Sequence, residues 1–115
     1  MTPEFLAPVS VEEFWRLAHR WPKAELVAGQ VIEMAPPDAR HGALVPAIIA
    51  RLSPYVTERR VGVVFAETGF ILSADPPTVR GPDIAVVLAE RVPTALPVGF
   101  SLGPPDLANR GAVTR

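Results

Sequence analysis

Apolar residues first recur at helical spacing near the N-terminal end of the chain. Ser10 and Glu13 stand at the start of this stretch with the spacing of a capping box, in which the serine hydroxyl accepts from the Glu13 amide while the glutamate carboxylate reaches back. The pattern predicts a helix over Val11 to His19 that ends at Trp21-Pro22. The residues expected to form its buried face are Phe14, Leu17 and Ala18.

Two short apolar-rich runs follow, Ala24 to Val27 and Gln30 to Met34, and Ala28-Gly29 separates them. Glycine supplies the positive φ that a tight turn demands, so the segment predicts a β-hairpin. Because side chains alternate between the two faces of a strand, Glu25 lies on the face opposite to Leu26. Glu25 therefore points either at a site or at water.

A longer helical pattern runs from about Ala39 to Arg59, with Asp38 as its N-cap. Its expected buried face repeats every three to four residues and consists of Leu44, Ala47, Ile48, Arg51, Leu52, Tyr55 and Val56. Pro46 and Pro54 lie inside the pattern. An interior proline costs about 3 kcal/mol through a lost hydrogen bond and a steric clash, so we expect this helix to be kinked or broken.

The second half of the chain is rich in strand patterns. They are Val61 to Ala66, Glu67 to Leu72 and Ile84 to Ala89, with a turn over Asp75 to Thr78. The last strand is the most apolar and is expected to be central. The segment from Val92 to Pro105 holds four prolines and is expected to be a loop. This order of elements predicts an α+β domain whose hairpin and later strands form one sheet with both helices against it.

Composition limits the chemistry. At 115 residues and 49% hydrophobic residues, the chain is expected to form a single domain. It has no cysteine, so any metal is held by oxygen or imidazole ligands, which suits magnesium-like or manganese-like ions. The net charge of -1 gives no overall positive field, so we expect weak non-specific affinity for DNA. No secretion signal or membrane-length apolar run is present, which makes the cytoplasm the default location and excludes a membrane span.

Two carboxylates are the candidate chemical groups. Asp83 follows a proline at the entrance to the apolar strand, and Glu25 lies in the hairpin. If these segments share a sheet, the two carboxylates can meet and bind a hard cation, which polarises a phosphate and lowers the pKa of a water molecule. In the structural alternative, Glu25 faces solvent and Asp83 is a turn residue.

Five segments occur in an order that resembles a known family. They read ELVAGQVIEM, APPDARHGALV, VVFAETGFIL, VRGPDIAVV and GFSLGPPDLA. From Ser10 to Ala108 the chain resembles the Uma family of putative restriction endonucleases, a branch of the PD-(D/E)xK nuclease superfamily. The resemblance implies a restriction-endonuclease-like mixed sheet flanked by helices, and Mg²⁺-dependent hydrolysis of DNA phosphodiester bonds. It also implies that Glu25 and Asp83 are catalytic carboxylates that hold the metal, and that His41 is a further site position.

Three neighbouring residues have a structural alternative. His41 lies three residues after Asp38 and can be held in a capping turn. Glu67 is a third ligand or an exposed strand residue, and exposure is favoured. Arg80 either steers a phosphate into the site or flanks the strand.

The C-terminal stretch departs from the family. After Pro105-Asp106 the family continues with apolar residues around a glutamate, then a loop, a helix with a basic residue and closing strands. Here Asn109 and Arg110 stand where the glutamate is expected. A guanidinium in place of a carboxylate reverses the charge and removes an oxygen donor, so we expect metal binding to be largely lost.

These features predict a single but incomplete domain over residues 1–115, with its C-terminal part missing and a loop-rich, poorly anchored tail over residues 92–115. We expect this chain to hydrolyse DNA little or not at all. The alternative is a non-catalytic interaction module that pairs through open sheet edges with a second copy, as a homo-oligomer, or with an intact relative.

Overall fold

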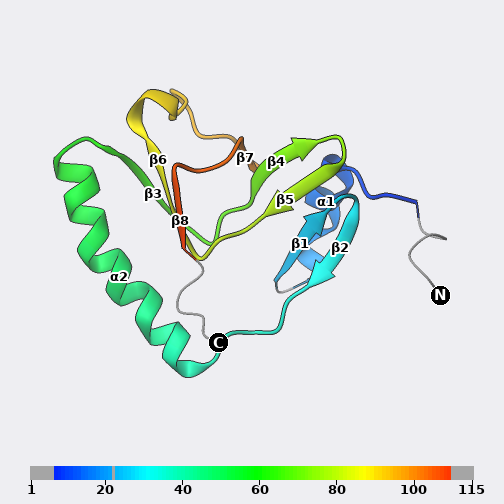
Figure 1. Cartoon of the computed structure of the whole chain (residues 1–115), viewed down its shortest axis with the longest axis horizontal. Coiled ribbons are helices and arrows are strands. Elements are labelled where there is room, and N and C mark those ends of the chain that lie inside the picture. The colour runs from blue at the N-terminus through cyan, green and yellow to red at the C-terminus, as the bar shows by residue number, and fades with distance from the viewer. Residues whose placement is uncertain (1–6, 22, 110–115) are drawn as a thin grey trace. The chain divides into compact units, whose positions relative to one another are not determined.

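A computed structural model describes residues 7–21 and 23–109 of the chain (Figure 1). They form two compact units, and we describe each by itself. Unit 1 takes its residues from Met1–Pro36, Gly69–Gly81 and Val98–Pro104. Unit 2 takes its residues from Pro37–Thr68, Pro82–Pro97 and Pro105–Arg115.

Unit 1 is a mixed sheet with a short helix. Its elements are α1 (Val11–Leu17), the 3₁₀ helix η2 (Ala18–Arg20), β1 (Ala24–Val27), β2 (Gln30–Glu33), β4 (Phe70–Ala74), β5 (Pro77–Arg80) and β7 (Ser101–Leu102). The strand order is β2-β1-β5-β4-β7, with β4 and β7 parallel and the other pairs antiparallel. Pro77 and Thr78, expected in a turn, therefore begin a strand, and the segment expected to be a loop contributes β7.

Local signals place the first helix and the hairpin. The Ser10 hydroxyl accepts from the Glu13 amide at 3.0 Å and the Ser10 amide donates to the Glu13 carboxylate at 3.2 Å, which confirms the capping box. The hairpin is also confirmed, because Ala28 at φ 50° and Gly29 at φ 83° make the tight turn between β1 and β2. Pro22, expected to end the first helix, lies outside the described residues.

The core of unit 1 is small and partly aromatic. Phe14, Leu26 and Val79 are each at most 3% exposed and pack together. Phe100, which precedes β7, stacks on Phe14 with ring centroids 5.5 Å apart. The contact ties a segment distant in sequence to the helix that the capping box begins.

Unit 2 is a three-stranded antiparallel sheet with one long helix. Its elements are α2 (Ala39–Glu58), β3 (Gly62–Ala66), β6 (Ile84–Leu88), the 3₁₀ helix η3 (Ala89–Arg91) and β8 (Leu107–Asn109). The strand order is β3-β6-β8, so β6 is central as its apolar sequence predicts, and α2 packs against β3 (Figure 1). A side chain at Gly62 would overlap the carbonyl oxygen of Val87, which explains the glycine at the start of β3.

Helix α2 differs from its prediction in two respects. It continues through Pro46 and Pro54, so the helix is not broken there, and the alternative of a kink stays a prediction. The expected buried face is right for Val56, which is buried, and wrong for Tyr55, which is 53% exposed, and it omits the buried Val45. Residues of the predicted face that lie on the exposed side are Leu44, Ala47, Arg51 and Tyr55. Apolar residues lie on more than one side of this helix, so the spacing of apolar residues alone does not identify the side that contacts β3.

The prediction of one sheet is wrong. Strands β3 and β6 pair with each other, whereas β5 pairs with β1 of the hairpin through Val79 opposite Leu26, and β4 pairs with β5. Alternation along a strand determines which side chains share a face but not which other strand it pairs with. The sequence pattern therefore could not show that the strands form two sheets.

Candidate functional site

Asp83 and His41 lie together in unit 2. Asp83 stands where the chain enters β6 and is only 3% exposed. His41 is in the first turn of α2, where its amide donates to the Asp38 carboxylate at 3.0 Å as the capping reading predicts. Its ring makes a second contact, because Nε2 lies 3.2 Å from Asp83 Oδ2. Unit 2 thus joins the start of α2 to the start of β6 through two candidate site residues.

This pair has a defined chemistry. Nε2 lies close enough to Oδ2 for an ion pair with a protonated imidazole, or for a hydrogen bond when Nε2 carries the proton. The contact occupies Nε2 and leaves Nδ1 for a hydrogen bond with a ligand.

Glu67 contacts the same site through its backbone. It has φ 48°, a left-handed conformation that non-glycine residues adopt at a cost, and its amide donates to the Asp83 carbonyl at 3.1 Å. Its side chain is exposed, as predicted. Sequence reasoning missed the backbone contact, although the Thr68-Gly69 pair after it is a turn signal.

Glu25 belongs to unit 1 and is also buried, at 3% exposure. Its Oε1 accepts from Arg80 Nη1 at 3.1 Å and its Oε2 accepts from the Gly81 amide at 2.9 Å. Glu25 therefore points into an internal ion pair and not at water, and Arg80, expected to steer a phosphate or flank the strand, is its partner. The meeting of Glu25 with Asp83 stays a prediction.

A magnesium site is not complete in the described residues. Mg²⁺ requires six ligands in octahedral geometry, mostly oxygens and including water. Across residues 7–21 and 23–109, no three histidine or acidic side chains gather closely enough to hold an ion. Asp83 and His41 supply one carboxylate and one imidazole, which already contact each other, and both Glu25 oxygens have donors within unit 1. The described residues therefore contain no cluster of three protein ligands, and binding of Mg²⁺ by Asp83 and Glu25 stays a prediction.

The second Pro-Asp segment anchors β8 to β6. The Asp106 carboxylate accepts from the Leu88 amide and from Arg91 Nη1, both at 2.8 Å. The Leu88 hydrogen bond is the main cause that holds the pKa of Asp106 below 3.8; desolvation acts against it and Arg91 lowers the pKa further. Asp106 is thus a structural residue.

Strand β8 ends beside the candidate site. Its last described residue, Asn109, is in register with Ile84, the neighbour of Asp83 in β6. An amide stands at this position, next to the place where the family resemblance predicts a glutamate. Arg110 lies outside the described residues, so its occupation of the glutamate position stays a prediction.

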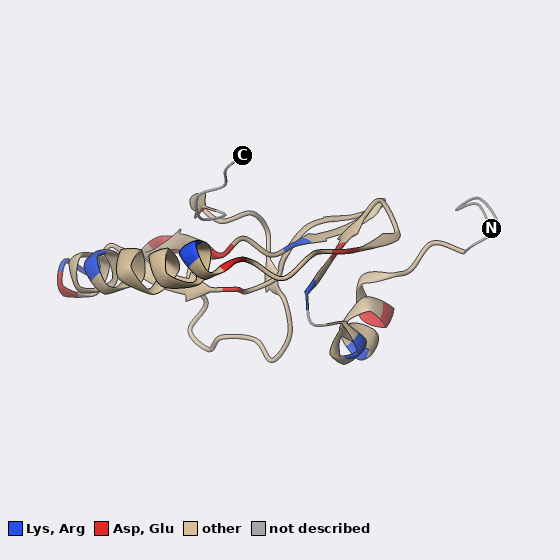
Figure 2. Cartoon of the chain, turned by 90° about the horizontal axis from the view of Figure 1, so that it is seen from below, with Lys and Arg blue, Asp and Glu red and all other residues tan. Residues whose placement is uncertain are grey.

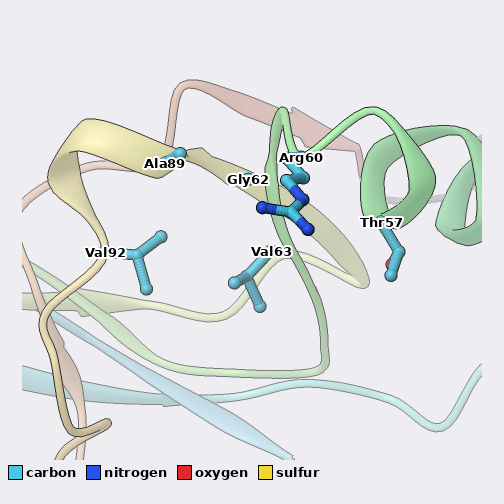
Figure 3. Close-up of a pocket in the computed structure, with 6 residues that line it drawn as sticks. All are labelled: Thr57, Arg60, Gly62, Val63, Ala89 and Val92. Carbon is cyan, nitrogen blue, oxygen red and sulfur yellow. The ribbon is translucent and has the colours of Figure 1, made fainter.

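An open hollow of about 380 Å³ lies elsewhere in unit 2 (Figure 3). Its lining residues are Thr57, Arg60, Gly62, Val63, Ala89 and Val92. Gly62 pairs with Leu88 at one end of the β3–β6 ladder, whereas Ala66 pairs with Ile84, beside Asp83, at the other. The hollow is therefore separate from the Asp83–His41 pair.

Comparison with known proteins identifies the family. The family model Uma2, described as putative restriction endonuclease, matches residues 11–108. The chain belongs to this family. No curated protein matches the chain.

A solved structure supports the fold. The crystal structure of a putative nuclease belonging to DUF820 from Anabaena variabilis is similar to the chain, with a TM-score of 0.62 and 20% identity. The match covers 86% of this chain and 55% of that chain, so the Uma2 chain spans about half the length of this neighbour. The predicted α+β, nuclease-like fold class is confirmed. In the described part of the chain, no helix combines the length and apolar character needed to cross a membrane.

Proposed function

We propose that this Uma2 chain is a DNA-binding, nuclease-like domain with little or no hydrolytic activity of its own. The observation that carries the proposal is the contact between buried Asp83 and half-buried His41 at the entrance to β6, in a chain of a restriction endonuclease family. DNA is the ligand class that the family implies. The proposed site residues are Asp83, His41 and Glu25.

Their proposed roles follow from their contacts. Asp83 orients the His41 ring, and His41 Nδ1 faces the ligand as a hydrogen-bond acceptor or, when the ring is protonated, as a donor to phosphate. Glu25 supports the end of β5 through Arg80 and Gly81. Mg²⁺ is the ion that the family implies. The incomplete donor set and the amide of Asn109 beside Ile84 support weak binding of that ion and weak hydrolysis by this chain.

A plasmid-nicking assay tests the proposal. Supercoiled DNA is incubated with the purified chain in magnesium, in manganese and in chelator, beside the double variant Glu25→Ala, Asp83→Ala. We expect the same, negligible nicking from both proteins, together with DNA binding by the wild type in a mobility-shift assay. Robust nicking by the wild type that is absent from the double variant would show an active enzyme.

Calorimetric titration tests the ion separately. We expect at most weak binding of magnesium or manganese, and any saturable heat should vanish in Asp83→Ala. Tight binding that survives this substitution would place the ion elsewhere and contradict the proposed site.

A further inference from the structure

The exposed face of α2 carries a row of arginines. Arg40 and Arg51 are eleven residues apart, about three helical turns, so they lie on the same side of the helix, and both are exposed. Arg59 and Arg60 follow at its C-terminal end. Figure 2 shows basic residues, in blue, at separate places along the long helix. Residues 39–60 hold four arginines and one acidic residue, Glu58, so this segment has a charge of +3 in a chain of net charge -1.

These arginines differ from those in the strands. Arg80 pairs with Glu25 and Arg91 with Asp106. Within residues 7–21 and 23–109, none of the four arginines between positions 39 and 60 pairs with a carboxylate. The Arg59 guanidinium instead lies 4.6 Å from the centre of the Tyr55 ring, a cation–π arrangement on an exposed tyrosine. An unpaired guanidinium keeps five N–H donors for an outside anion, and phosphate matches its planar geometry.

The row begins at the candidate site. Arg40 precedes His41, whose ring contacts Asp83, and Arg51 lies about 16 Å further along the helix axis. A DNA major groove is about 12 Å wide, so a helix that lies across or along the groove can bring these two side chains to phosphates on both of its edges. Phosphate contacts of this kind position a protein on a duplex and carry no sequence information.

We propose that Arg40 and Arg51, which we name the α2 basic row, contact the phosphate backbone of duplex DNA and hold the duplex beside Asp83 and His41. The inference rests on the proposed function, since it takes DNA as the ligand. Charge complementarity favours DNA as the ligand of this face, because separated guanidinium groups without carboxylate partners match a regular series of phosphates. The overall negative charge of the chain means that attraction is local to this face.

Salt-dependent binding of a short fluorescent DNA duplex tests the row. The variant Arg40→Gln, Arg51→Gln is compared with the matched control Arg16→Gln, Arg20→Gln. The control removes two arginines from unit 1 that are also exposed and have no ion pair within the described residues. Both variants change the net charge by the same amount. Thermal melting of each protein confirms that it folds.

We expect the slope of log K against log salt to become shallower by about 1.8 in the α2 variant, at about 0.9 for each phosphate contact, and to stay unchanged in the control. Equal slopes for the two double variants, or an unchanged slope in the α2 variant, would overturn the inference while leaving DNA binding in place. Competition by poly-glutamate as strong as competition by unlabelled duplex would also overturn it and assign the row to an acidic protein. A wild-type chain that does not bind DNA at low salt would overturn the proposed function itself.

Discussion

At the scale of the residue, Glu25 shows how a buried charge is accommodated. The alternation of side chains along β1 predicted that Glu25 faces either a site or water. In unit 1 it instead lies in an internal ion pair. Arg80 and the Gly81 amide together satisfy both carboxylate oxygens. A buried carboxylate without such donors would be costly, so these contacts account for an acidic residue that is 3% exposed. The sequence could not reveal the pair, because Arg80 lies 55 positions away on another strand.

Glu25→Ala should therefore destabilise the fold. The substitution leaves the Gly81 amide without its acceptor, and we expect a loss of about 1–3 kcal/mol in the free energy of unfolding by urea. Arg80 is 45% exposed, so water can solvate its guanidinium when the carboxylate is absent. The lost ion pair should therefore contribute little to the destabilisation. Glu33→Ala on the neighbouring strand β2 is the control, since Glu33 is exposed and its loss should change stability by less than about 0.5 kcal/mol. Equal stability of the two variants would mean that the Glu25 carboxylate is not structural.

At the scale of the element, local signals predicted more than pairing patterns did. The Ser10–Glu13 capping box, the Asp38 cap and the Ala28-Gly29 turn act over three or four residues, and each is present as predicted. The choice of strand partners and of the buried arc of α2 depends on contacts between segments distant in sequence, which alternation does not encode. The same contrast holds in the candidate site. The local Pro-Asp pair at the start of β6 indicated Asp83, whereas the contacts of Asp83 with His41 and Glu67 join segments distant in sequence.

The anchor of β8 makes an element-scale prediction about pH. A lowered pKa means that ionised Asp106 favours the folded chain, so its contribution is complete above the ordinary value of 3.8 and is lost as pH falls through the lower folded-state pKa. Asp106→Asn keeps an acceptor for the Leu88 amide but removes the charge. The wild type should therefore unfold at higher urea concentration than this variant near neutral pH, and the difference should disappear in strong acid.

Urea midpoints measured across the acid range provide the check. Glu90→Gln removes one negative charge from the adjacent 3₁₀ helix, so it reports the general effect of net charge. Any change of the urea midpoint with pH beyond the change caused by this control is assigned to Asp106. A wild type and an Asp106→Asn variant that differ by the same amount at every pH would contradict the role of the ionised anchor.

At the scale of the whole molecule, apolar side chains remain at the sheet edges of both units. In the described strands, β2 and β7 end one sheet and β3 and β8 end the other, and β2, β7 and β8 each carry a large exposed aliphatic residue. These residues are Ile32 at 44%, Leu102 at 79% and Leu107 at 57% exposure. An edge strand with apolar side chains is a template for pairing with another chain. This observation favours the second candidate function, an interaction module that pairs through an open edge.

Strand β8 is the best place to test that pairing, because all three of its residues are exposed. We expect the chain to self-associate with rising concentration in analytical ultracentrifugation, and Leu107→Lys to reduce the association because a charge on an edge strand opposes strand addition. Leu96→Lys is the matched control: Leu96 is 54% exposed and belongs to the same unit but not to a strand. If the two lysine variants weaken association equally, exposed apolar area and not the β8 edge drives it. A wild type that sediments as a monomer at every concentration would rule out self-pairing through β8. The proposed binding of DNA would then remain as the candidate function.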